Sequence, residues 1–185
     1  VALAAVVAAS SVTAVPTPKK AEAAGVTAYL CFMSKSYNGV LSNHDDSNRS
    51  KGVMNGNKKA SIGGIKISNA TIKKGKFTAT VSVTGKNLKK FSGDKGWNAI
   101  YVDTSLAGTK KSSLKVTKAV LKMDGKTVKT IKSPALTPDP GKKQSYTQVM
   151  FLNAWNSYAQ KKCKAASITK MPTKSMSITI SGTLK

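Results

Sequence analysis

The stretch KFTATVSV, residues 76–83, alternates strictly between polar and apolar side chains. Its apolar positions are Phe77, Ala79, Val81 and Val83, and every residue between them is Lys, Thr or Ser. Successive side chains of a β-strand point to opposite faces, so a period of two predicts a strand with one face in a core and the other in water. The fold is therefore expected to contain a sheet with one solvated face.

Similar short runs, each predicted to be a strand, occur along the rest of the chain at residues 26–33, 62–67, 98–102, 114–123, 126–131, 146–152 and 176–184. Asp124-Gly125 separates two of them and predicts a tight hairpin, because both residue types tolerate positive φ. Helical patterning is scarce, since residues 87–91 and 157–166 could each supply only one or two turns. We expect one all-β domain over residues 24–185, a single antiparallel β-sandwich of jelly-roll or immunoglobulin-like type with about seven to nine strands.

Two stretches interrupt this pattern and are predicted to be mobile loops. Residues 38–59 are rich in Asn, Ser, Gly and Asp, and residues 133–145 contain three prolines. Loops of this kind often carry binding residues on a rigid scaffold.

The first residues have the features of a targeting signal. VALAAVVAASSVTAV, residues 1–15, is apolar but too short to span a bilayer securely, and Ala21-Glu22-Ala23 has the small-x-small form of a signal-peptidase site. We expect residues 1–23 to be a secretory signal peptide whose start is missing. A buried N-terminal helix is the alternative, which Pro16 and Pro18 disfavour. No later run approaches the roughly 18 apolar residues of a membrane helix, so we expect a secreted protein, extracellular or at the cell surface, without a membrane span.

Metal and disulfide chemistry is sparse. An exported chain can keep disulfides, and Cys31 and Cys163 either form one or remain as buried free thiols. Two sulfurs and a single His cannot complete the usual four-ligand zinc site. Asp46 and Asn48 could help to hold calcium, although an exposed polar loop explains them equally well. We expect no cofactor and no bound metal.

Charge is the strongest functional signal. The chain has 31 Lys and Arg against seven Asp and Glu, a formal net charge of +24. Residues 24–185 keep 28 Lys and Arg49 against six Asp and no Glu. A field of this size attracts anionic partners. Arg makes most bidentate contacts to phosphate and guanine, whereas Lys acts as a hydrated point charge. We therefore expect a polysaccharide or other anionic polymer as partner, and no sequence-specific reading of nucleic acid.

Groups suited to catalysis are few. Asp94, Asp124 and Asp139 fall in predicted turns or loops, and the only His, His44, lies in a polar loop. A glycosidase would need two carboxylates across a cleft, and only Asp103 with Asp45 or Asp46 could supply them. Nothing in their spacing supports that pair, so we expect a protein that is not an enzyme.

Aromatic residues with neighbouring amides indicate a sugar site. The segment NAWNSY, residues 153–158, sets two aromatic rings among amides just after a predicted strand. Flat apolar faces flanked by Asn suit ring stacking and hydrogen bonding to sugar hydroxyls. The candidate ligand-binding residues are Asn153, Trp155, Asn156 and Tyr158, together with Trp97 and Tyr37. As alternatives, Trp155 could close the end of the sandwich, and Trp97 could belong to either the core or the rim.

Four segments, taken in order, resemble a known class of domain. They are GKFTATV at residues 75–81, AVLKMDGK at 119–126, FLNAW at 151–155 and SITI at 177–180. Together they resemble the β-sandwich accessory domains of exported glycan-degrading proteins from gut Clostridia, many of which are carbohydrate-binding modules. The resemblance implies a sandwich fold and a sugar ligand.

These observations lead to two main functional hypotheses. In the first, the protein is a secreted, noncatalytic, monomeric carbohydrate-binding domain that favours acidic polysaccharide. In the second, a Lys-rich surface or adhesion protein binds wall teichoic acid, mucin or DNA by charge alone. Sugar binding should fail on Trp155→Ala or Tyr158→Ala, whereas binding by charge should survive these changes and weaken steeply with salt. A third reading gives the lysines no specific partner and only a role in solubility.

Overall fold

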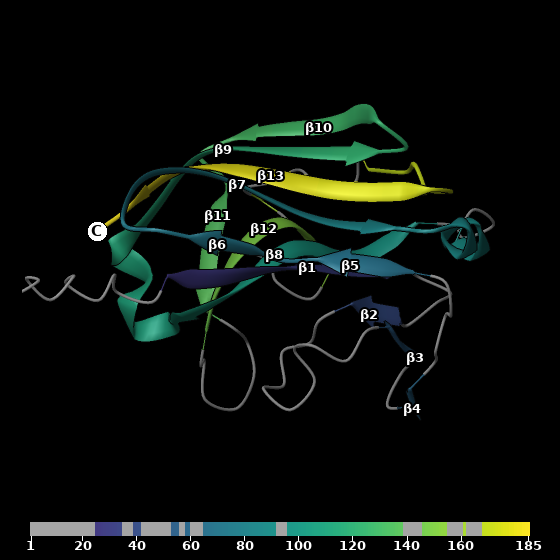
Figure 1. The fold of residues 1–185 in the computed structure, drawn as a ribbon, viewed down its shortest axis with the longest axis horizontal. Helices are drawn as coiled ribbons and strands as arrows, with labels where there is room; N and C mark the ends of the chain where they lie inside the picture. Colours follow the sequence, from purple (N-terminus) through teal and green to yellow (C-terminus); the bar gives the residue numbers. More distant parts are fainter. Residues whose placement is uncertain are drawn as a thin grey trace, which may run out of the picture.

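The computed structural model describes residues 25–34, 39–41, 53–55, 58–59, 65–91, 96–138, 146–154, 161 and 168–185. Most of these residues lie in β-strands that form two five-stranded sheets, packed face to face as two layers (Figure 1). All pairings between neighbouring strands are antiparallel. The predicted all-β sandwich is therefore confirmed.

The first layer, here called the β8 sheet, has the strand order β11-β12-β8-β1-β6. Its strands are β1 (Val26–Ser34), β6 (Ala70–Ile72), β8 (Trp97–Ala107), β11 (Ala135–Pro138) and β12 (Tyr146–Asn153).

The second layer, the β13 sheet, has the order β10-β9-β13-β7-β5. Its strands are β5 (Lys66–Ser68), β7 (Gly75–Thr84), β9 (Leu114–Met123), β10 (Lys126–Lys132) and β13 (Ser175–Leu184).

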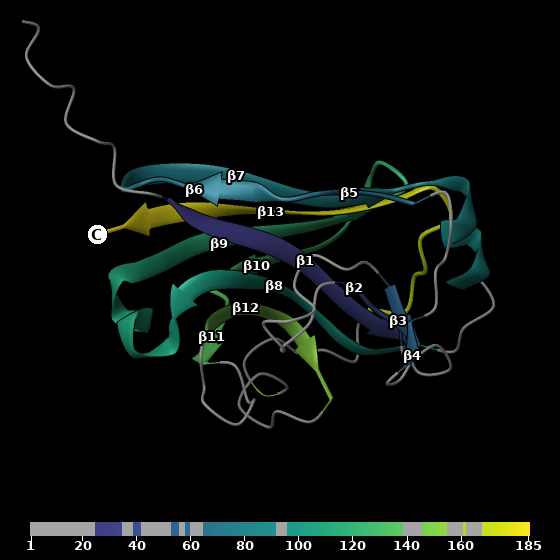
Figure 2. The ribbon, with the colours of Figure 1, turned by 60° about the horizontal axis from the view of Figure 1, so that its bottom comes forward.

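Smaller elements surround the two layers. Strands β2 (Gly39–Leu41), β3 (Val53–Asn55) and β4 (Lys58–Lys59) pair with one another, and they lie on the side of β1 that faces away from the β13 sheet (Figures 1 and 2). The described residues also include two 3₁₀ helices. They are η2 (Lys86–Phe91), which covers the short turn predicted at residues 87–91, and η3 (Gly108–Ser113), which was not predicted.

Alternating side chains from both layers form the core. From the β13 sheet, Val81, Leu121 and Ile178 are almost completely buried, and from the β8 sheet so are Leu30 and Val102. Full burial of such a side chain contributes about 1.5–3 kcal/mol. The alternation read in residues 76–83 thus places one face of β7 in the core and the other in solvent.

Strand β8 extends well beyond the predicted residues 98–102, and buried and exposed residues do not alternate along it. It lies in the middle of its sheet between β12 and β1, and its residues from Ala99 to Thr104 are all buried. Because both faces of β8 are covered, both accept apolar residues, and a period of two is lost.

The two stretches predicted as loops contain short strands. Strand β11 lies within residues 133–145, and β2, β3 and β4 lie within residues 38–59, so for these residues the prediction was wrong. Runs of two to four residues are too short to show a period. Strand β11 also ends at Pro138, which an edge strand tolerates because its missing N–H would face outward. The predicted helical turns at residues 157–166 lie outside the described residues, except for Lys161.

The Asp124-Gly125 hairpin is confirmed, with φ of 51° and 77° at its two residues. The Asp124 carboxylate also accepts hydrogen bonds from the backbone N–H groups of Thr173, Lys174 and Ser175, at 2.7–3.1 Å, and from the Thr173 hydroxyl at 3.0 Å. Partial burial raises the pKa of Asp124, but these hydrogen bonds outweigh it and lower the pKa from 3.8 to about 2. One carboxylate thereby fixes the start of β13.

Within the described residues, no helix has the length and apolar character needed to cross a bilayer.

Candidate functional site

The outer face of the β13 sheet carries two facing columns of hydroxyl groups. Register pairs Thr84 with Ser175, and the pairing continues along both strands to Lys76 and Thr183. We call these columns the hydroxyl ladder; its members are Thr78, Thr80, Ser82 and Thr84 of β7, and Ser175, Ser177, Thr179, Ser181 and Thr183 of β13. All of them are exposed or half-buried.

The hydroxyl ladder is held in place by hydrogen bonds across the strands. The side-chain oxygens of Thr80 and Thr179 lie 2.8 Å apart, and those of Thr78 and Ser181 lie 3.1 Å apart. Each hydroxyl has one hydrogen to donate and two lone pairs. A bonded pair therefore uses one of its two hydrogens, and the other is available to a ligand.

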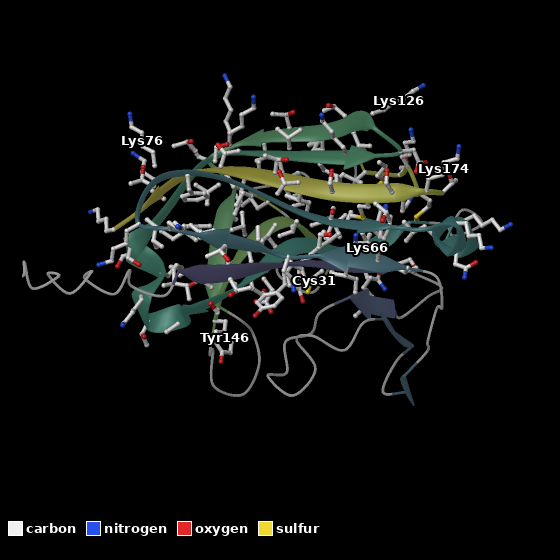
Figure 3. The ribbon with its side chains drawn as sticks, viewed as in Figure 1. Cys31, Lys66, Lys76, Lys126, Tyr146 and Lys174 are labelled. Carbon is white, nitrogen blue, oxygen red and sulfur yellow. The ribbon has the colours of Figure 1, made fainter. Side chains whose placement is uncertain are left out.

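Exposed lysines border the ladder on both sides. Their positions follow from register, because Lys66 pairs with Thr84, Lys118 with Ser181 and Lys132, and Lys122 with Ser177. This lysine rim comprises Lys66, Lys76, Lys115, Lys118, Lys122 and Lys132, all exposed. Figure 3 shows side chains projecting outward from this sheet, with Lys66 and Lys76 labelled.

No carboxylate occurs in the sequence of the five strands of this sheet. Of the described acidic residues, Asp103 is fully buried in the β8 sheet, and Asp124 lies in the β9–β10 turn with both carboxylate oxygens bonded to the segment before β13. The charges of the rim are therefore not offset by acidic side chains of their own strands. Such a surface attracts anions.

Two residues predicted to bind a ligand are buried instead. Trp97 is 4% exposed, meets Phe32 edge to face at a ring-centroid distance of 5.7 Å, and donates its Nε1–H to the Lys170 carbonyl at 2.9 Å. Asn153 is 3% exposed. The core thus encloses the Trp97 ring, and its faces cannot stack on a sugar in this structure.

The remaining predicted residues are not brought together by the described structure. Trp155, Asn156, Tyr158 and Tyr37 lie outside the described residues, as do His44, Asp45, Asp46 and Asn48 of the possible calcium or catalytic loop. Cys31 is buried in β1, and Cys163 lies outside the described residues, so the disulfide stays a prediction.

Asp103 belongs to the interior of the β8 sheet. Its Oδ1 accepts the Thr104 N–H at 3.0 Å, and register places it in one row with Tyr29 and Gln148. Full burial separates this carboxylate from solvent. Among the residues that the structure describes, no group of three or more His, Cys, Asp or Glu side chains could hold a metal ion.

The chain matches no protein-family model, and comparison with curated proteins and with solved structures also gave no match. The resemblance to accessory domains of glycan-degrading proteins therefore stays a prediction.

Sequence reasoning identified the alternation in residues 76–83 but not the hydroxyl ladder. The missing information was register, which decides which polar residues of distant strands become neighbours. A signal was nevertheless present, since residues 175, 177, 179, 181 and 183 are all Ser or Thr and residues 115, 118 and 122 are all Lys.

Proposed function

We propose that this protein is a secreted, noncatalytic binding protein for anionic polymers, with acidic polysaccharide as the favoured class. The hydroxyl ladder and the lysine rim together form its contact surface. One observation supports the proposal above all: the outward positions of the five paired strands include the six exposed lysines of the rim and the nine Ser and Thr residues of the ladder, and they include no carboxylate.

The chemistry of this face favours a sugar polymer over nucleic acid. Lysines attract carboxylate, sulfate or phosphate without demanding a particular geometry, and the ladder hydroxyls can exchange hydrogen bonds with sugar hydroxyls. Binding of single-stranded nucleic acid usually adds aromatic platforms for bases. The only aromatic residue in these five strands, Phe77, is paired with Gly182 on the opposite side of the sheet from the ladder.

The test is retention of the protein in gels that contain polygalacturonate, compared with gels that contain a neutral glucan. Replacing Lys118, Lys122 and Lys132 with Gln should weaken binding roughly tenfold, since each exposed ion pair contributes up to about 1 kcal/mol. The matched control replaces the exposed Lys86, Lys111 and Lys170, which lie off this face, and changes the net charge equally. Equal losses in both variants would contradict a defined surface, and absence of retention in the unmodified protein would contradict the function.

Binding by charge alone is the second candidate function. A variant that lacks hydroxyl groups of the ladder distinguishes it from sugar binding. Thr80→Val with Thr179→Val keeps the β-branched shape but removes two facing hydroxyls. We expect this variant to lose affinity for polygalacturonate and to keep its affinity for polyglutamate, which has carboxylates but no sugar hydroxyls. Unchanged binding of both polymers would favour binding by charge alone.

The predicted aromatic site can be tested in the same gels. If Trp155→Ala and Tyr158→Ala abolish binding while the triple Lys118, Lys122 and Lys132 variant binds normally, the segment at residues 153–158 is the site and the lysine rim is not.

A further inference from the structure

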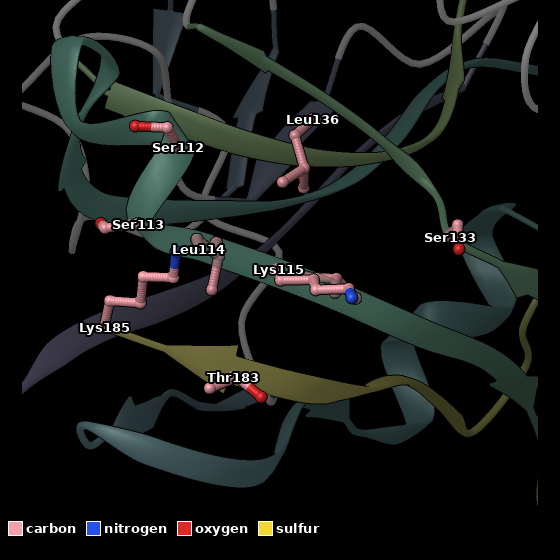
Figure 4. Close-up of a pocket in the computed structure, with 9 residues that line it drawn as sticks. Ser112, Ser113, Leu114, Lys115, Ser133, Leu136, Thr183 and Lys185 are labelled. Carbon is pink, nitrogen blue, oxygen red and sulfur yellow. The ribbon is translucent and has the colours of Figure 1, made fainter.

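Two adjoining hollows open at one end of the sandwich, where η3 meets the start of β9 and the end of β13. The larger has a volume of about 520 Å³, and its lining comes from η3, β9, β11 and β13 (Figure 4). The smaller has about 310 Å³, and both are lined by Ser113 and Lys185. Small-molecule sites typically occupy about 300–1,000 Å³, so each hollow is large enough for a small ligand.

The larger hollow exists because β10 leaves β9 early. The last paired residues of these strands are Lys132 and Lys118. The Ser133 N–H then donates a hydrogen bond to the Thr117 carbonyl oxygen, with a nitrogen–oxygen distance of 3.0 Å. Ser133 has φ of 47° and is followed by Pro134, after which the chain enters β11 of the other sheet. The first residues of β9 therefore have no β10 neighbour, and the space beside them stays open.

Close backbone approach on the other side of β9 positions the lysines. Register shifts between Ser181 and Gly182, so that Gly182 faces Val116 and Thr117 is the extra residue of a bulge. A Cβ at Gly182 would lie 2.0 Å from the Lys115 carbonyl oxygen. The Lys185 N–H donates to the Ser113 carbonyl at 2.9 Å, which fastens the end of β13 to η3.

The lining combines amines, hydroxyls and apolar side chains. In the larger hollow these are Lys115 and Lys185, Ser112 and Thr183, and Leu114 and Leu136. The smaller adds Lys74 and Lys110. Among the described residues that line the two hollows, none has an acidic or an aromatic side chain. A ligand complementary to both needs negative charge, several hydroxyls and a partly apolar ring, which is the chemistry of a sugar acid.

We propose that the two hollows form one binding site for consecutive residues of a uronic acid oligosaccharide. Lys115 and Lys185 meet the carboxylate of one residue, and Lys74 and Lys110 meet that of the next. This inference rests on the proposed function and deepens it, because the lysine rim attracts the polymer by its charge whereas the hollows recognise single sugar units.

The experiment is calorimetric titration of the full chain with trigalacturonate at about 0.15 M salt, where exposed charges more than about 8 Å apart are largely screened. Lys115→Gln with Lys185→Gln should weaken binding at least about tenfold. Leu136→Trp, which fills the larger hollow without changing charge, should do the same. Lys86→Gln with Lys170→Gln removes the same charge from exposed lysines that line neither hollow, and it should change affinity less than about twofold. Neutral maltotriose should not bind.

Several results would overturn the site. These are equal trimer affinity in all variants, an equal loss in the two double Lys variants, or binding of tripolyphosphate as tight as that of trigalacturonate. Retention of long polygalacturonate reports separately on the proposed function. If the triple Lys118, Lys122 and Lys132 variant loses polymer binding while the trimer binds no form of the protein, the hollows are not a site but the lysine face remains one.

Discussion

At the scale of single residues, Asp124 connects two strands that are distant in the sequence. It turns β9 into β10 and holds the backbone N–H groups of residues 173–175 before β13. Asn also tolerates positive φ, so Asp124→Asn keeps the turn but offers only one acceptor oxygen and no charge. We expect the free energy of unfolding at neutral pH, measured by urea denaturation, to fall by only about 1–2 kcal/mol, because solvent partly screens the half-buried carboxylate.

The same carboxylate predicts a pH dependence. Its pKa is about 2 in the folded protein and 3.8 as an ordinary value, so the ionised form is favoured by folding. The stabilisation is complete above the ordinary value and is lost as the pH falls toward 2. The difference in unfolding free energy between the unmodified protein and Asp124→Asn should shrink over that interval. A difference that stays constant from pH 6 to about pH 2 would show that the charge does not matter.

Trp97 gives a second test at this scale. Trp97→Phe keeps an aromatic ring in the core but leaves the Lys170 carbonyl without its indole donor, so it should lower the unfolding free energy by about 1–3 kcal/mol. Because the ring is enclosed, retention by polygalacturonate should not change when measured well below the midpoint of unfolding. If a stably folded Trp97→Phe variant lost retention, Trp97 would be part of the ligand-binding site after all.

At the scale of elements, Gly182 permits the close contact of β13 with β9. Gly182→Ala should destabilise the protein by about 2 kcal/mol or more, because the added Cβ meets a backbone carbonyl that cannot move aside. Gly75→Ala is the matched control. It has φ of 96° and no atom within 4 Å of the added Cβ, so it should cost only about 1–2 kcal/mol of backbone strain. Thermal unfolding of both variants measures the difference, and equal shifts would show that the close contact is not decisive.

How far elements could be predicted depended on how they are buried. Strands β7, β9 and β13 each have one face exposed to solvent, so polar and apolar residues alternate along them. This alternation predicted both ends of each strand to within one residue. Strand β8 is covered on both faces and was predicted too short, and β6 was missed because it has only three residues. The ladder depends on the register of β7 with β13, and the larger hollow depends on the end of the β10–β9 pairing at Lys132 and Lys118. Neither is visible in one sequence.

At the scale of the whole molecule, a net charge of +24 should make salt act in opposite directions on folding and on binding. Like charges repel one another more strongly in the compact state, so screening between about 20 mM and about 500 mM NaCl should raise the midpoint of thermal unfolding. The same screening should weaken retention by polygalacturonate. The triple Lys118, Lys122 and Lys132 variant has three fewer charges on one face, so both salt effects should be smaller in it than in the unmodified protein. A midpoint that falls with salt would mean that attractions between charged groups in the folded protein outweigh the repulsion among its lysines.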